Sequence, residues 1–299
     1  MEKRMRFLLG FAAVVGLIAA AWVVSSKPVE AQTTLTGDWK ASVQKDGDKI
    51  QLNFNEKRGR NQSGQSYDFN ELQGLSREQA LRGGPVKFSL VREAGRIDCE
   101  GTFQDGKGSG TYQLTANASF ISGMKSRGFD FETNRRGFDG ETDDRLFAAI
   151  TLNITTALAD DLSATFGKVT IDDLFKGAIF KVDSNFAREM RATGYENLGL
   201  EDLVKARIFK IDANFVRQVS AMGFEKEPFE SLVKMQIFKV TPEFIAEMGD
   251  EGLRNLRIEE LVKLRIFKID SQFIRDAKAD GVPMEVERLV QRKIGVARR

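Results

Sequence analysis

The sequence predicts an α+β protein, in which an N-terminal antiparallel β sheet or small barrel precedes a solenoid-like domain of α-helical repeats. Two observations predict this fold. Between residues 35 and 117, short segments alternate apolar and polar residues and are joined by brief polar turns, as antiparallel strands are. Between residues 119 and 295, one helical pattern returns every 29 residues, which is typical of stacked repeats.

The opening segment, residues 1–31, has the pattern of a secretory signal peptide. A cationic start precedes an apolar run at residues 7–24, and Val29-x-Ala31 then has the small-residue spacing of a signal-peptidase site. The run of 18 residues is also just long enough to span a bilayer, so an uncleaved inner-membrane anchor is the alternative. In both cases we expect the rest of the chain to be exported, periplasmic or secreted, and to touch the membrane only through this segment.

The composition argues against most enzyme classes. The 299 residues include no histidine and a single cysteine, Cys99. This excludes histidine general bases, the usual serine–histidine and cysteine–histidine sites, the HExxH zinc motif and any internal disulfide. The opening segment holds four basic and two acidic residues, so the remainder holds 41 of each and is neutral. A neutral chain lacks the positive excess of a nucleic-acid binder. We therefore expect no enzyme activity, no cofactor, no metal site and no nucleic-acid partner.

The β segment is predicted to hold about six strands. A hairpin comes first, because two alternating runs flank Asp46-Gly47. A short strand follows, and Ser76 and Gln79 then have the spacing of a capping box that begins a helical turn. Three alternating runs in quick succession, at residues 86–90, 97–103 and 110–114, predict an antiparallel meander with one buried face.

A curled sheet of this kind is able to hold a small ligand in a cavity lined by Trp39, Phe54 and Tyr112. The alternative is that these rings form the core of the sheet, because each is in phase with the apolar face of its strand. Cys99 is expected to be a small buried strand residue.

Each 29-residue unit is predicted to form two short helices. The first has acidic residues in its first turn and ends near an Ile-Phe-Lys triplet, and a capping residue then begins the second. The predicted caps are Asp183, Asp212, Thr241 and Asp270, and the glycines that end the second helices are Gly194, Gly223, Gly252 and Gly281. A single helix pair cannot bury its own apolar face. We therefore expect Ile208, Phe209 and Phe215, with their equivalents in other units, to form a shared core.

The lysine of the triplet is the main candidate for partner binding. It recurs as Lys181, Lys210, Lys239 and Lys268. One repeat apart, these side chains are expected to form a row that binds a partner. The alternative, which we favour, is a charge that interacts with the last carbonyls of the first helix.

The repeat resembles a known bacterial module. Its junction Val240-Thr241-Pro242-Glu243-Phe244-Ile245, and the β segment around residues 86–95, are similar to the extension of membrane-bound zinc metallopeptidases of the β-lactam sensor/antirepressor type. The resemblance covers about residues 35–295. It implies a sensing or interaction role. Peptidase activity is not implied, because the chain has neither their multi-span membrane domain nor, without histidine, their zinc motif.

Two functions follow from these observations. The first is an exported interaction or sensing protein of the cell envelope that binds another envelope protein or a peptide. The second is a small-ligand sensor or carrier that uses the β domain. An enzyme built on the acidic pairs is disfavoured, because adjacent acids on a helix diverge by about 100°. These pairs are Asp143-Asp144, Asp160-Asp161 and Asp172-Asp173. We interpret them as helix caps and first-turn charges.

Export is testable directly. Mass spectrometry of the chain recovered from the envelope fraction should show an N-terminus at Gln32, because the peptidase site ends at Ala31. An intact Met1 in the inner membrane would instead favour the anchor, and an intact Met1 in soluble cytoplasm would contradict export altogether.

Overall fold

A computed structural model describes residues 35–45, 48–56, 62–131, 135–136, 142–143 and 145–295. The chain divides into Met1–Thr33 and a compact unit, Thr34–Arg299, that holds all the described elements. The predicted signal segment therefore lies outside the described residues. Within the described part of the chain, no helix combines the length and the apolar character that crossing a membrane requires.

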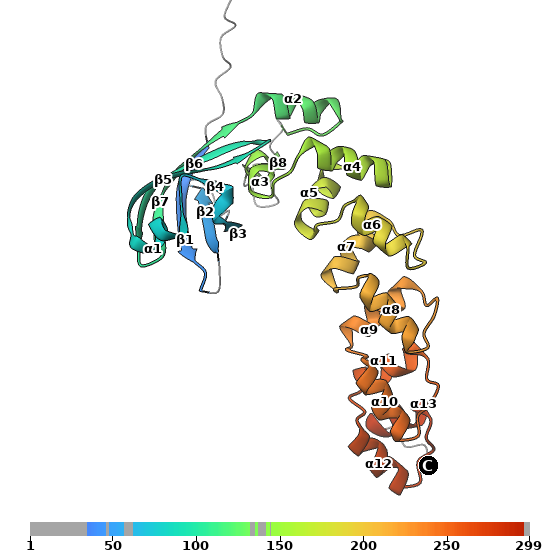
Figure 1. Ribbon diagram of the computed structural model, residues 1–299. Coiled ribbons are helices and arrows are strands. Elements are labelled where there is room, and N and C mark those ends of the chain that lie inside the picture. The colour runs from blue at the N-terminus through green and yellow to red at the C-terminus, as the bar shows by residue number, and fades with distance from the viewer. Residues whose placement is uncertain are drawn as a thin grey trace, which may run out of the picture. The chain divides into compact units, whose positions relative to one another are not determined.

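The predicted α+β class is confirmed, since a curved seven-stranded antiparallel sheet precedes a series of helices (Figure 1). The strand order is β3-β2-β1-β7-β6-β5-β4, so the first and last strands of the β segment are neighbours in the middle of the sheet. The strands are β1 (Leu35–Val43), β2 (Lys49–Glu56), β3 (Gln62–Asp68), β4 (Leu72–Gln73), β5 (Gly84–Arg92), β6 (Gly95–Gln104) and β7 (Lys107–Ala116). A second, two-stranded sheet pairs β8 (Arg135–Arg136) with β9 (Thr142–Asp143).

The interior of the curved sheet is filled by aromatic rings that lie close against the strands. Glycines permit this approach, because a Cβ atom at Gly101 would lie 2.7 Å from the Trp39 ring. Near the sheet, α1 (Arg77–Arg82) begins with the predicted capping box, in which the Gln79 N–H donates to the Ser76 hydroxyl at 3.2 Å. The sheet also packs on the first helices, where the buried Tyr67 hydroxyl donates to the Thr151 carbonyl at 3.2 Å.

The helical region consists of short helices of seven to eleven residues. The first three are α2 (Ala118–Ser126), α3 (Arg145–Thr151) and α4 (Thr156–Phe166). The 29-residue units then contribute α5 (Ile171–Phe180) with α6 (Ser184–Arg191), α7 (Leu200–Ile208) with α8 (Ala213–Ala221), α9 (Phe229–Ile237) with α10 (Pro242–Asp250), and α11 (Ile258–Ile266) with α12 (Ser271–Ala279). A last helix, α13 (Val286–Lys293), begins a fifth unit.

The predicted caps begin the second helix of each unit. In every unit the N–H of a phenylalanine donates to the cap side chain three residues earlier. These bonds join Phe186 to Asp183 (2.9 Å), Phe215 to Asp212 (2.8 Å), Phe244 to Thr241 (3.3 Å) and Phe273 to Asp270 (2.8 Å).

Both helices of a unit end in the same type of turn. One residue adopts the left-handed conformation, and after seven of the eight helices α5 to α12, all except α6, the next N–H donates to the carbonyl five residues back, which is a Schellman motif. The predicted glycines hold the left-handed position after the second helices, with φ between 74° and 98°. After the first helices this position belongs to lysine, and the closing bonds run from Val182 to Gly177, Ile211 to Ala206, Val240 to Met235 and Ile269 to Leu264.

The expectation that Ile208 and its equivalents belong to the core is wrong. Ile208 is 49% exposed, whereas Ile211 is 1% exposed. The Schellman turn explains why Ile211 is buried and Ile208 is not. The turn brings the residue after the lysine back over the end of the helix, and this residue packs into the core. Phe209 and Phe215 are partly buried and pack against the core.

The phenylalanines of the second helices are buried to different degrees, which leads to a prediction. Phe244 is 3% exposed, and Phe244→Ala should lower the free energy of unfolding by about 3–5 kcal/mol, as deletion of a buried ring does. Phe215 is only partly buried, so Phe215→Ala should cost clearly less. Urea denaturation of both variants checks this, and equal losses would show that the exposure of the ring does not set its contribution.

Candidate interaction surface

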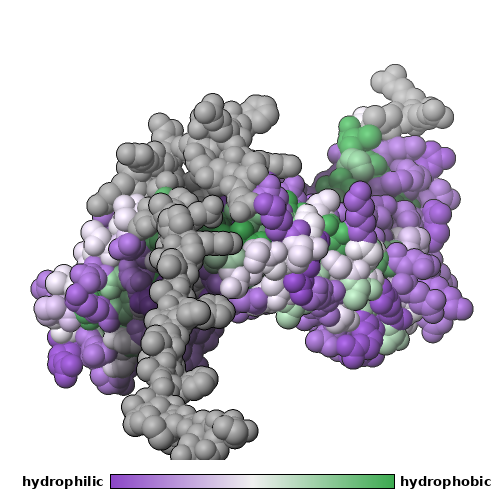
Figure 2. Space-filling view, turned by 90° about the horizontal axis from the view of Figure 1, so that it is seen from above, coloured by the Kyte–Doolittle hydropathy of each residue, from purple (hydrophilic) through white to green (hydrophobic). Residues whose placement is uncertain are grey.

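One large apolar side chain in each repeat remains in solvent. Five isoleucines at the end of successive first helices are 47–53% exposed, and we call them the isoleucine row. The row consists of Ile179, Ile208, Ile237, Ile266 and Ile294. Among the described residues, only Leu81 and Val91 are other large apolar side chains in the exposed class. Figure 2 shows how hydrophilic residues cover most of the described surface in that view.

The row shares a helix face with ion pairs that join neighbouring repeats. Ile208 lies seven residues after Glu201 and three after Lys205, so these side chains project from one side of α7. Lysines of one unit pair with glutamates of the next: Lys176 with Glu201, Lys205 with Glu230 at 2.6 Å, and Lys263 with Glu287. The hydrogen bond that each ammonium donates to the glutamate carboxylate raises the pKa of Lys176 and of Lys205. Exposed pairs of this kind stabilise weakly.

The four predicted lysines all occupy the left-handed position of the turn. Their φ angles are 54° at Lys181, 56° at Lys210, 54° at Lys239 and 51° at Lys268. Three of their backbone carbonyls accept hydrogen bonds from the next repeat: Lys181 from Arg207 at 3.0 Å, Lys210 from Gln236 at 3.3 Å, and Lys239 from Arg265 at 2.8 Å. The backbone of the lysine, through its left-handed conformation and its carbonyl, thus ends the first helix and binds the next repeat. Binding of a partner by the exposed ammonium groups remains a prediction.

The arginines that reach these carbonyls also cover aromatic rings. The guanidinium carbon of Arg207 lies 3.6 Å from the centroid of the Phe186 ring, and that of Arg265 lies 3.8 Å from the centroid of the Phe244 ring. Both rings are buried. Gln236 stands at the equivalent position between them and carries no charge, and Phe215, the ring of that junction, is only partly buried.

The three residues of the predicted ligand cavity lie inside the sheet. Trp39 is fully buried, packs at 5.2 Å (ring centroids) against Phe88 and donates its indole N–H to the Glu100 carbonyl at 3.2 Å. The ring centroids of Phe54 and Tyr112 are 5.2 Å apart, and both rings also contact the ring of Phe147 of α3. A ligand among these rings would have to displace one of them. Cys99 is buried, as expected, and burial raises the pKa of its thiol.

Three acids of the predicted pairs, Asp160, Asp161 and Asp173, accept hydrogen bonds that hold the helices. The Thr170 hydroxyl and N–H donate to the Asp173 carboxylate, and these bonds lower its pKa. Asp160 accepts two hydrogen bonds from Arg127, at 2.7 and 2.8 Å, which likewise lower its pKa. Asp161 accepts from the Ser184 N–H at 2.8 Å. Asp144 lies outside the described residues. Among the described residues, no group of three or more carboxylates or thiols is placed to hold a metal ion.

The isoleucine row was missed at the sequence level, although a signal was present. Each triplet places isoleucine and phenylalanine side by side at the end of a helix, where adjacent residues point about 100° apart. The following lysine, a residue without β-branching, is compatible with a left-handed turn. Taken together, these features indicate that the chain reverses immediately, and only one of the two apolar residues is then able to face the core.

The left-handed lysine gives a stability prediction. Lys210→Gly should raise the free energy of unfolding by about 0.5–1 kcal/mol, because glycine adopts this conformation without steric cost. Lys210→Val should lower it by about 1–3 kcal/mol, because β-branched residues fit this region poorly. Chemical denaturation of both variants is the measurement. Equal changes in the free energy of unfolding for Lys210→Gly and Lys210→Val would contradict the view that the backbone conformation of this residue matters.

Comparison with protein-family models, with curated proteins and with solved structures found no match to this chain. The resemblance of its repeats to the extension of membrane metallopeptidases therefore remains a prediction from the sequence.

Proposed function

We propose that this chain is an exported, non-enzymatic interaction or sensing protein of the bacterial cell envelope, and that its repeats bind a protein or peptide partner through the isoleucine row. The carrying observation is that the same apolar position is exposed in five successive units. Scattered apolar residues are normal on a protein surface, whereas a repeated exposed position supports a binding surface.

The helix α3, which precedes the 29-residue units, already has the end of a helix packed against another part of the chain. The turn that ends α3 is also a Schellman motif, with Asn153 in the left-handed position. In this turn Thr151 occupies the place that Ile208 has in α7, and it is 4% exposed because the sheet covers it. The end of a first helix is thus suited to pack against another polypeptide. In the later units no described part of the chain covers the isoleucine at this position, and its side chain is exposed.

The partner that fits this edge is an extended segment with spaced apolar side chains and some acidic residues. Four of the five isoleucines, all except Ile294, lie two residues before a lysine with an exposed side chain, so an aliphatic group alternates with a positive charge along these repeats. Binding would then rest on apolar burial, with the lysines favouring acidic segments.

A pair of matched double variants tests the proposal. Ile208→Asn with Ile237→Asn removes two members of the row, and Leu81→Asn with Val91→Asn removes two exposed apolar side chains elsewhere. Partner capture is measured after a photo-crosslinking residue is placed at Ile266. The row variant should lose at least tenfold in the amount of crosslinked partner, while the control retains it.

Stability is measured in parallel. Both double variants should keep the urea midpoint of the unchanged chain, because substitutions at exposed sites cost little. Equal crosslinking by the two variants would overturn the proposal, as would a loss that only follows a lowered midpoint.

A further inference from the structure

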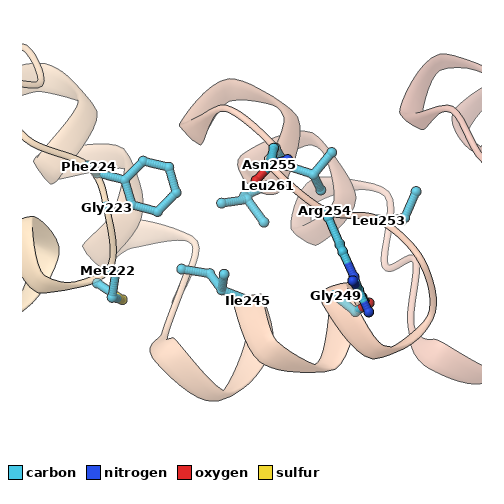
Figure 3. A pocket seen from close by; sticks show the side chains of 10 residues that line it. Met222, Gly223, Phe224, Ile245, Gly249, Leu253, Arg254, Asn255 and Leu261 are labelled. Carbon is cyan, nitrogen blue, oxygen red and sulfur yellow. The ribbon is translucent and has the colours of Figure 1, made fainter.

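A cavity of about 510 Å³ lies between two neighbouring repeats. Its walls come from the end of α8, from α10 and from the turn that leads to α11 (Figure 3). Most lining side chains are apolar, namely Met222, Phe224, Ile245, Leu253, Leu256 and Leu261. Arg254 is the single charged residue among those that line the cavity. The volume lies within the range of small-molecule sites, and polar groups line the cavity beside the apolar side chains.

The preceding junction holds a pair of aromatic rings that has no counterpart beside the cavity. One repeat earlier, Tyr195 packs edge-on against Phe229 at 6.1 Å (ring centroids) and donates its hydroxyl to the Glu227 carbonyl at 2.7 Å. In the next repeat the equivalents of the two rings are Phe224 and Ile258. Phe224 has no hydroxyl to anchor it and Ile258 offers no ring, so the space stays open beside Phe224.

Two further positions depart from the repeat at this place. Gly249 stands where the other units carry Arg191, Ser220 and Lys278, and a Cβ atom there would meet nothing within 4 Å. Arg254 stands where the two preceding units carry Glu196 and Glu225. The junction has thus lost a side chain that would narrow the cavity and gained a positive charge in place of a negative one.

Arg254 is placed to meet a ligand at the mouth of the cavity. It is exposed, and among the described residues it forms no ion pair. Its Nε donates a long hydrogen bond of 3.4 Å to the Gly249 carbonyl, which directs the side chain along the wall of α10 (Figure 3). Asn255, which follows it in the left-handed conformation with φ 56°, adds an amide group beside the cavity.

We propose that this inter-repeat cavity is a binding site for an aliphatic chain that ends in a carboxylate, of the medium-chain fatty-acid class. The chain lies among Met222, Phe224, Ile245 and Leu256, and the carboxylate pairs with Arg254. No member of the isoleucine row lines this site, so it is independent of the partner surface.

Calorimetric titration of the chain purified from the envelope fraction with decanoate tests the site. The unchanged chain should bind one equivalent. Gly249→Leu should weaken the affinity at least tenfold, because Gly249 lines the cavity and a Cβ atom there meets nothing within 4 Å, so that the longer side chain takes up cavity space. Ser220→Leu, which introduces the same side chain at the equivalent position of the preceding repeat, should leave the affinity unchanged. Ile245→Trp narrows the cavity from another turn of α10 and should also weaken binding, should Gly249→Leu fail to fold.

The charge is tested separately with decanol, which has the same chain and no carboxylate. Decanoate should bind the unchanged protein at least tenfold more tightly than decanol does, and Arg254→Gln should remove this difference without changing the affinity for decanol. Unchanged decanoate affinity in both cavity-narrowing variants would overturn the site. Equal binding of decanoate and decanol to the unchanged protein would overturn the role of Arg254 and with it the ligand class.

Discussion

The helical repeats of this protein depend on one backbone conformation, the left-handed residue that follows both helices of each repeat unit. It ends the helix, satisfies the terminal carbonyls and places the following apolar residue over the helix end. After the first helices, the same turn presents the lysine carbonyl to the next unit, where Arg207, Gln236 or Arg265 donates to it. One local turn thus sets the core, the exposed isoleucines and the link between repeats.

The sheet is joined to the helices by aromatic packing and by a side-chain hydrogen bond to a helix carbonyl. The Phe147 ring of α3 packs against Phe54 and Tyr112 of the sheet, and the Tyr67 hydroxyl reaches the last residue of α3. The sheet therefore covers the first end of the array, which in repeat proteins requires a cap, since an uncovered terminal unit leaves apolar surface in water.

Much of the fold was predictable because its determinants are local. The caps at Asp183 and Asp212, the glycines that end the second helices, and the capping box at Ser76 each depend on a few adjacent residues. The error at Ile208 arose because periodicity treats a helix as continuous to its last residue, whereas the turn exchanges which apolar residue faces inward. The cavity beside Phe224 was not predictable, because it results from the absence of a ring that only the three-dimensional arrangement of two repeats places there.

The uncharged Gln236, which takes the position of Arg207 and Arg265, lies at the junction between an N-terminal and a C-terminal block of repeats. The buried residues form two hydrophobic clusters that meet within α8 and α9, with Val216 and Val233 in the first and Val219 and Met235 in the second. At this boundary Gln236 donates a 3.3 Å amide hydrogen bond beside the Lys205–Glu230 ion pair, and the guanidinium that covers the ring at the neighbouring junctions is replaced by an amide. In a linear array each unit is held only by its neighbours, so local unfolding stops where coupling is weakest. We therefore expect the C-terminal block to open before the block attached to the sheet, and its amide protons to exchange with solvent first.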